Sequence, residues 1–339
     1  MRMFSFDPGD LADTYASRGW AHIRHGATPE FVEHLREYHR RHAAPGAVLH
    51  GTGIQGAKEQ LLYEPPPEVD LRGELRTVVH RMCGLDPGGF TLAERHVKMY
   101  SPDADPAPVA HKDRLASQVS IGVSIDIPEP SRLVIYPDVH REVNPFLTGE
   151  LIPSLAPRQR PEMILPDAPA VEIADRPGDV TLFAGSSTWH LRRHSAGAVL
   201  LYLKCNDFNS DPLGEDPTTE LRHRSTVALL GEPDPEAWAQ ATAVVARRLE
   251  WVGRVRGRDG VVRPFAKLWD RPPTLVSESD LVVLERLDAG GAVRADAGGA
   301  RSAEAVEALV RLARLGLVDL VGAAEHPVAD TAHGASAPA

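Results

Sequence analysis

Three residues of metal-binding types stand out in the sequence: His111, Asp113 and, much further along, His190. His111 and Asp113 lie two positions apart, just before an apolar run with strand character at Val119–Ile127. In an extended chain, residues two apart point to the same side, so both side chains can reach one metal ion. A His-x-Asp tripeptide is common by chance, and its interpretation depends on a third ligand.

The third candidate ligand follows a turn and a strand. Residues 177–179 read Pro-Gly-Asp, a turn signal, and the apolar run Val180–Phe183 leads on toward Trp189 and His190. Two imidazoles and one carboxylate that leave one face of the metal open are the ligand set of non-haem Fe(II) oxygenases. The open face is needed because a co-substrate and O₂ both bind there. His194 lies four positions further on and competes as the distal ligand.

A third stretch carries a resemblance to a known family. Residues 133–140 read Leu-Val-Ile-Tyr-Pro-Asp-Val-His. This stretch resembles the Leu-x-x-x-Pro-Gly-Ser-His pattern of the Fe(II)/2-oxoglutarate-dependent oxygenase superfamily, in its phytanoyl-CoA dioxygenase-like branch. The segment Gly19–Ile23 and the helix expected before it look like the opening of that branch. The resemblance covers roughly residues 8 to 208.

The resemblance implies that His111, Asp113 and His190 bind Fe(II), and that 2-oxoglutarate and O₂ are co-substrates. It favours His190 over His194, because His190 ends its run at the length that the family uses. The implied enzyme is a hydroxylase-type dioxygenase that oxidises an unactivated C–H bond of a small molecule in specialised metabolism. Asp113 argues against halogenation, since halogenases of this class carry a small residue there. His140 matches a structural position of the family and is left out of the metal set.

The chain departs from the family at the co-substrate site. Relatives place an arginine ten or eleven residues after the distal histidine, and those positions are Leu200 and Leu201 here. Burying a dianion without a cation would be costly. The remaining candidates for binding 2-oxoglutarate are Arg192, Lys204 and Lys98.

The elements around these residues predict a mainly β fold with flanking helices (α+β). Its core is expected to be a double-stranded β-helix, a jelly roll of the cupin-like kind, over residues 1–208. A helix is expected over Asp10–Gly19 and another from Thr28. The clearest strands are Trp20–Arg24, Arg95–Tyr100, Val119–Ile127, Arg132–Tyr136, Val171–Ile173, Val180–Phe183 and Ala198–Leu203.

The remainder is expected to be smaller units. Residues 209–276 are expected to be a linker and helical segment, with the polar linker over Asn209–Glu220 and a helix from about Pro235 to Val255. Residues 277–322 resemble a small winged-helix module, with a Gly290-Gly291 turn between its helices. This span is net acidic, which disfavours DNA binding and leaves a packing, homodimer or partner-docking role. Residues 323–339 are predicted to be a disordered tail.

Composition limits the class of protein. Apolar residues make up 42% and charged residues 25%, as in a globular protein without membrane spans. The net charge of −10 makes nucleic acid an improbable partner. Cys83 and Cys205 are too few for a disulfide framework. With no signal-peptide pattern at the start, the expected location is the cytoplasm.

Two other interpretations remain open. JmjC-type protein hydroxylases also use His-x-Asp with a distal histidine, and some carry a winged-helix-like C-terminal module. A β-barrel binding or regulatory protein with an accidental triad is the non-enzymatic alternative. The missing arginine is its best support.

Overall fold

The computed structural model describes residues 1–42, 58–147, 150–231, 238, 240–269, 271–288, 293–294 and 300–321. The chain divides into two compact units, Met1–Asp216 and Pro217–Ala339. The two units are therefore described separately. No helix in the described ranges has the length and hydropathy that crossing a lipid bilayer requires.

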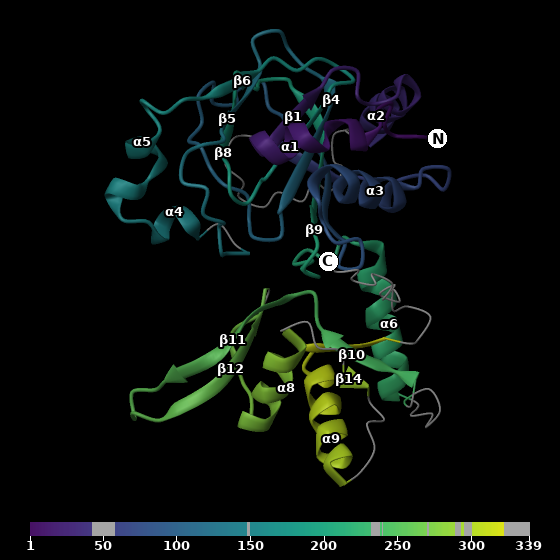
Figure 1. The fold of residues 1–339 in the computed structure, drawn as a ribbon, viewed down its shortest axis with the longest axis vertical. Helices are drawn as coiled ribbons and strands as arrows, with labels where there is room; N and C mark the ends of the chain where they lie inside the picture. Colours follow the sequence, from purple (N-terminus) through teal and green to yellow (C-terminus); the bar gives the residue numbers. More distant parts are fainter. Residues whose placement is uncertain are drawn as a thin grey trace, which may run out of the picture. The chain divides into compact units, whose positions relative to one another are not determined.

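The first unit is built on a six-stranded antiparallel sheet, here called the major sheet (Figure 1). In spatial order its strands are β1 (Trp20–Ile23), β7 (Val180–Phe183), β4 (Val119–Asp126), β9 (Val199–Asn206), β3 (Thr91–Tyr100) and β2 (Lys58–Leu62). Neighbours in space are mostly distant in sequence, so the sheet joins segments from the whole unit. The predicted strands at 119–127 and 180–183 match β4 and β7, whereas β2 was not predicted.

A three-stranded minor sheet contains β6 (Val171–Ile173), β5 (Arg132–Tyr136) and β8 (Trp189–Arg193), in that order. Leu133, Ile135 and Ile173 from this sheet form one buried cluster with Phe183 of the major sheet. The two antiparallel sheets therefore pack face to face, as in a double-stranded β-helix. The predicted fold class is confirmed.

Helices cover the outer face of the major sheet. They are η1 (Pro8–Leu11), α1 (Ala12–Arg18), α2 (Pro29–His42) and α3 (Leu71–Cys83). Alternation along β9 explains the layers: Leu201 and Leu203 join the core beneath the helices, whereas Tyr202 and Lys204 face the interior between the sheets. Because successive side chains of a strand point to opposite faces of the sheet, the buried strand β9 presents polar residues to the interior and apolar residues to the helices.

The connection from β5 to β6 forms three short helical segments, α4 (Leu151–Ser154), η2 (Pro157–Gln159) and α5 (Pro161–Ile164). Figure 1 shows α4 and α5 beyond β8, on the side away from α2 and α3. Leu151, Leu155 and Ile164 pack against the cluster of Trp189 and Leu191 on β8. This connection therefore lies over the outer face of the minor sheet.

The first unit ends later than the sequence suggested. Residues 209–216 were expected to be linker, yet Asp211 and Asp216 are fully buried. The Asp216 carboxylate accepts a 2.8 Å hydrogen bond from the Leu92 amide of β3, and Asp211 accepts one of 3.0 Å from the Asp216 amide. Asp211 and Asp216 therefore belong to the first unit, because their carboxylates accept hydrogen bonds from buried backbone N–H groups.

The second unit has a core of its own, whose buried apolar residues lie between Ala243 and Leu320 in the sequence. Its elements are α6 (Pro217–Gly231), β10 (Thr242–Val245), β11 (Leu249–Arg256), β12 (Val262–Leu268), β13 (Thr274–Leu275), α8 (Glu278–Asp288), β14 (Val293–Arg294), α9 (Ala300–Arg314) and β15 (Val318–Val321). They form two three-stranded sheets, β14-β10-β15 and β11-β12-β13.

The helix predicted from Pro235 to Val255 is wrong from Thr242 onward, where β10 and β11 lie. The β-branched and aromatic residues of this stretch favour strands once partners such as β12 and β15 are present. The helix–helix–strand order expected over 277–322 is present as α8, α9 and β15. The Gly290-Gly291 turn and the 323–339 tail lie outside the described residues.

Candidate metal centre

Backbone pairing brings His111 and His190 together. The two residues form an isolated antiparallel bridge, with two N–H···O hydrogen bonds of 2.9 Å between them. Their ring centroids are 4.4 Å apart. Because His190 belongs to β8, the minor sheet fixes the spacing of both imidazoles.

Asp113 is fixed by three further contacts. Its amide donates to the Gly185 carbonyl at 3.0 Å, and its own carbonyl accepts from Asn144 Nδ2 at 2.8 Å. The Ser120 hydroxyl of β4 donates to Oδ2 at 2.6 Å. One ligand atom from each of His111, Asp113 and His190 lies within 4.8 Å of the other two. The His-x-Asp pair and the distal histidine therefore converge, as the spacing predicted.

The tautomer of His190 suits a metal ligand. Its Nδ1 lies 2.9 Å from the Thr188 carbonyl oxygen, which can only accept, so Nδ1 carries the proton. Nε2 is left as a lone-pair donor and lies 3.8 Å from Asp113 Oδ2. Phe183 packs edge-on against the His190 ring at 4.7 Å between centroids. A backbone acceptor behind a ligating imidazole is the usual outer-sphere partner in metal sites.

The Asp113 carboxylate is ionised. Burial alone would raise its pKa, but the positive charge of Lys204 and the fields of His190 and His111 outweigh burial and hold it far below the ordinary value. The donor set is thus two imidazoles and one carboxylate, which fits ferrous iron.

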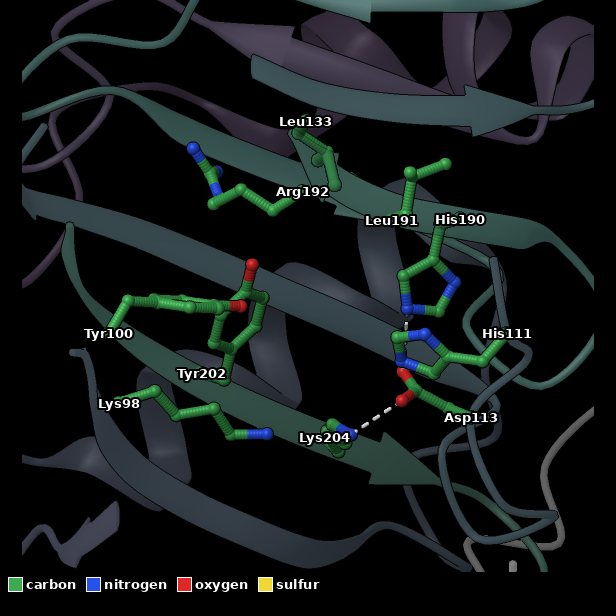
Figure 2. A pocket seen from close by; sticks show the side chains of 10 residues that line it. All are labelled: Lys98, Tyr100, His111, Asp113, Leu133, His190, Leu191, Arg192, Tyr202 and Lys204. Atoms are coloured by element: carbon green, nitrogen blue, oxygen red, sulfur yellow. Dashed lines mark hydrogen bonds and ion pairs between the residues drawn. The ribbon is translucent and has the colours of Figure 1, made fainter. Parts of the chain in front are cut away.

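The triad opens onto one pocket between the sheets (Figure 2). The pocket is lined by Lys98, Tyr100, His111, Asp113, Leu133, His190, Leu191, Arg192, Tyr202 and Lys204. All six residues predicted from the sequence as ligands or co-substrate contacts are in this lining. Tyr100 and Tyr202 are the polar lining residues that sequence reasoning missed.

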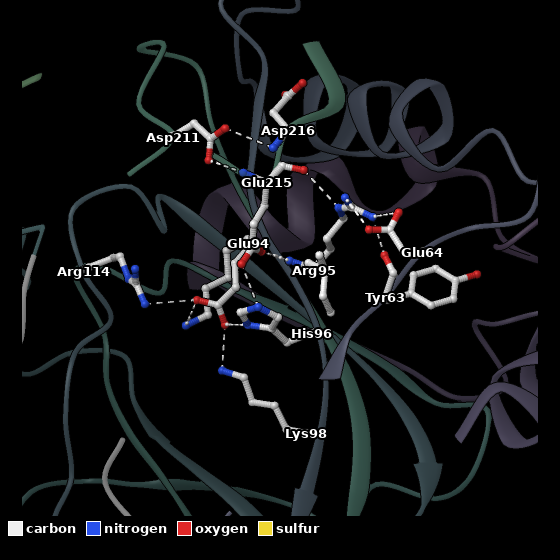
Figure 3. Close-up of polar contacts among 12 residues, drawn as sticks. Tyr63, Glu64, Glu94, Arg95, His96, Lys98, Arg114, Asp211, Glu215 and Asp216 are labelled. Carbon is white, nitrogen blue, oxygen red and sulfur yellow. Dashed lines mark hydrogen bonds and ion pairs between the residues drawn. The ribbon is translucent and has the colours of Figure 1, made fainter. Parts of the chain in front are cut away.

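The two lysines share one buried carboxylate, that of Glu94. Figure 3 shows Lys98 and Arg114 beside this carboxylate. Lys98 Nζ lies 2.8 Å from one oxygen of Glu94, and Lys204 Nζ lies 3.4 Å from the other. Lys204 also donates to Asp113 Oδ1 at 2.7 Å. Two further side chains lie close to the Glu94 carboxylate: Arg114 Nη2 at 3.5 Å and His96 Nδ1 at 3.4 Å. Glu94, which the sequence did not single out, therefore holds the pocket lysines in place.

Arg192 is paired on the other side of the pocket. Its Nη1 and Nη2 donate to the two oxygens of Asp175 at 2.9 and 2.8 Å, and Nη1 also contacts the Ser131 hydroxyl at 3.1 Å. The Ser124 hydroxyl donates to Asp175 at 2.6 Å. Such a bidentate pair fixes the guanidinium plane firmly.

The rival histidines do not belong to this site. His194 is exposed, and its left-handed backbone, with φ of 49°, turns the chain after β8. His140 is exposed as well. Lys112 donates to the carbonyls of His140 and Glu142 and lies over the Trp189 ring. Lys112, which lies between the proposed ligands His111 and Asp113 in the sequence, thus binds the backbone of the loop after β5.

No family model matches the sequence, and no curated protein matches it either. Solved structures similar to this chain include a prolyl-4-hydroxylase from Pseudomonas putida, at 18% identity, covering 59% of this chain and 97% of the other, with a TM-score of 0.40.

Two further similar structures are described as cofactor or co-substrate complexes. The epimerase SnoN with Fe³⁺, alpha ketoglutarate and nogalamycin RO has 19% identity, coverage of 60% and 84%, and a TM-score of 0.45. EctD from S. alaskensis with 2-oxoglutarate and 5-hydroxyectoine has 15% identity, coverage of 59% and 76%, and a TM-score of 0.41. The matched part of this chain is thus about the size of its first unit.

Proposed function

We propose that the first unit is a non-haem Fe(II)/2-oxoglutarate-dependent oxygenase in which His111, Asp113 and His190 bind the iron. The observation that carries the proposal is the convergence of these three side chains on one pocket, within 4.8 Å. When bound, ferrous iron would supply the activation of O₂ for oxidising a C–H bond.

The chain's own residues prepare the site. Ser120 and Lys204 each donate to one oxygen of Asp113, and the Thr188 carbonyl orients His190. These contacts fix the ligands before any metal arrives, which reduces the reorganisation that binding requires. The face of the triad toward the pocket remains available for a co-substrate and O₂.

The charges of the pocket support a dianionic co-substrate. The charged side chains of the lining are Lys98, Arg192, Lys204 and Asp113. Glu94 and Asp175 pair with these cations from outside the lining. These six side chains carry three positive and three negative charges, and Arg114, which lies 3.5 Å from Glu94, adds one more positive charge. A divalent iron would therefore leave at least two uncompensated positive charges. A keto-acid dianion would neutralise them, which removes much of the cost of burying it.

The substrate is proposed to be a small molecule that enters the pocket between the sheets. A role in specialised metabolism, the phytanoyl-CoA dioxygenase-like branch, a cytoplasmic location and a homodimer formed through the second unit remain predictions. The JmjC-like protein hydroxylase remains the enzymatic alternative, and a β-barrel without catalytic activity the other.

Succinate formation tests the proposal. Protein loaded with Fe(II) and supplied with 2-oxoglutarate, O₂ and ascorbate should release succinate, because these oxygenases also turn over slowly without substrate. The control is the Asp113→Ala variant, which lacks the carboxylate ligand. Succinate no higher than in this control would contradict the proposed use of 2-oxoglutarate.

A further inference from the structure

Leu200, at the position where the family carries its arginine, belongs to a buried apolar cluster in this chain. Leu200 is fully buried and belongs to one cluster with Ala198 and Tyr202, against which Tyr100 and Ile127 pack. Because residue 200 is a leucine, this position supplies no positive charge to the pocket. Another group of this chain must therefore receive the far carboxylate of the keto acid.

Lys204 is at the wrong end of the pocket for this task, and Lys98 is engaged by the Glu94 carboxylate. Lys204 donates directly to Asp113, so its ammonium lies beside the proposed metal. Lys98 binds the same Glu94 carboxylate as Lys204. The far carboxylate of 2-oxoglutarate is separated from the chelating keto group by two methylene carbons. A group in contact with a metal ligand is therefore suited to the chelating end of the co-substrate.

The opposite end of the pocket carries two tyrosines and Arg192. Figure 2 shows the hydroxyls of Tyr100 and Tyr202 away from the triad, on the same side of the pocket as the Arg192 guanidinium. Arg192 is buried, with 4% exposure, and its Nε has no hydrogen-bond partner among the described residues. Asp175 occupies only Nη1 and Nη2. This end therefore still has a donor to offer.

We propose that Tyr100, Tyr202 and Arg192 together hold the far carboxylate of 2-oxoglutarate, in place of the family's arginine. The inference rests on the proposed function. Two hydroxyls on the major sheet and a guanidinium on the minor sheet would grip the carboxylate from both layers of the fold. Leu200 contributes indirectly, because it packs with the two aromatic rings.

The protonation states suit this role. Burial raises the pKa of Tyr100 and of Tyr202, so both hydroxyls keep their protons at any ordinary pH and remain donors. Lys98 lies over the Tyr202 ring, 5.0 Å from its centroid. A cation on the ring face is attracted to the ring and holds it in place.

A glycine makes room for Tyr202. A Cβ at Gly122 of β4 would lie 3.3 Å from Cε1 of the Tyr202 ring. Any larger residue at position 122 would push the ring toward the pocket. The ring position is thus set by Gly122 on the neighbouring strand and by the Leu200 cluster.

The test compares two keto acids that differ only at the far end. 2-Oxopentanoate has the same five-carbon chain as 2-oxoglutarate but ends in a methyl group. Both are titrated anaerobically into the Fe(II)-loaded protein, and the dissociation constants are read from the visible absorption of the chelate. The ratio of the two constants isolates the contribution of the far carboxylate, because both ligands share the metal end.

The variants are Tyr202→Phe, Tyr100→Phe and the double variant. Tyr136→Phe is the matched control, since Tyr136 is buried outside the pocket lining. Each tyrosine variant should lower the preference for 2-oxoglutarate about tenfold, as expected for loss of one hydrogen bond to a charged group. Tyr136→Phe should retain the native preference.

The outcomes separate this inference from the proposed function. A native preference in both tyrosine variants would overturn the assignment of Tyr100 and Tyr202 while leaving the oxygenase proposal intact. If neither keto acid produces an absorption band with the native protein, the proposed function fails, and this inference fails with it.

Discussion

Gly185 lies so close to Asp113 that a Cβ at position 185 would be 2.7 Å from Asp113 Oδ2. The same atom would be 2.2 Å from the Ser120 hydroxyl oxygen. The turn between β7 and β8 therefore touches the carboxylate that we propose as an iron ligand, and only a residue without a side chain fits there.

A Gly185→Ala substitution should weaken Fe(II) binding, because the new methyl group displaces Asp113 or Ser120. Anaerobic calorimetric titration with Fe(II) measures the effect. Gly231→Ala is the control, since a Cβ at Gly231 meets none of the described residues within 4 Å. Equal Fe(II) affinity in both variants would show that the Asp113 geometry is not needed for metal binding.

Ser120→Ala should lower Fe(II) affinity by about 10- to 100-fold, as is typical when an outer-sphere partner of a ligand is lost. The substitution removes the 2.6 Å hydrogen bond to Asp113 Oδ2. Ser154→Ala, at an exposed site, serves as the matched control. An unchanged dissociation constant for Fe(II) would argue that Oδ2 does not face the metal.

Arg192→Met should destabilise the protein by about 3 to 5 kcal/mol, because Asp175 would remain buried without its cation. The double variant Arg192→Met/Asp175→Asn should recover part of this free energy of unfolding. Urea unfolding of both variants measures the difference. A double variant at least as unstable as the single one would contradict the pairing.

The buried Glu94 predicts a pH dependence. Burial alone would raise the pKa of Glu94, but Lys204 and Lys98 outweigh burial and hold the pKa well below its ordinary value. A depressed carboxyl pKa contributes stability above the ordinary value, and this contribution is lost as the pH falls toward the native pKa.

In Glu94→Gln, the free energy of unfolding should therefore decrease less between about pH 6 and about pH 3 than in the native protein. Urea unfolding at several pH values gives both slopes. Glu33→Gln, at an exposed site of α2, is the control and should retain the native slope. A Glu94→Gln slope equal to the native one would contradict the account.

The triad could be predicted from sequence because local patterns place it. His111 and Asp113 share one extended segment, and the run that ends at His190 starts with a clear turn. The strands β5, β6 and β7 could be predicted residue by residue for the same reason, since apolar runs between turn residues determine them. These features need no knowledge of distant contacts.

The co-substrate end could not be predicted in this way. Tyr100 and Tyr202 are ordinary strand residues until β3 and β9 pair and face Arg192 across the two sheets. Glu94 is likewise an unremarkable acid until Lys98 and Lys204 surround it. Cross-strand proximity depends on sheet order, which one sequence does not reveal.

The central claim is most directly tested by an anaerobic titration of the metal-free protein with Fe(II) and then 2-oxoglutarate, followed by visible absorption. We expect the weak charge-transfer band of a chelated keto acid in the native protein, and no band in the His111→Ala, Asp113→Ala and His190→Ala variants. Equal bands in the native protein and these variants, or Fe(II) binding with no band at all, would contradict the claim that these residues form the iron and 2-oxoglutarate site.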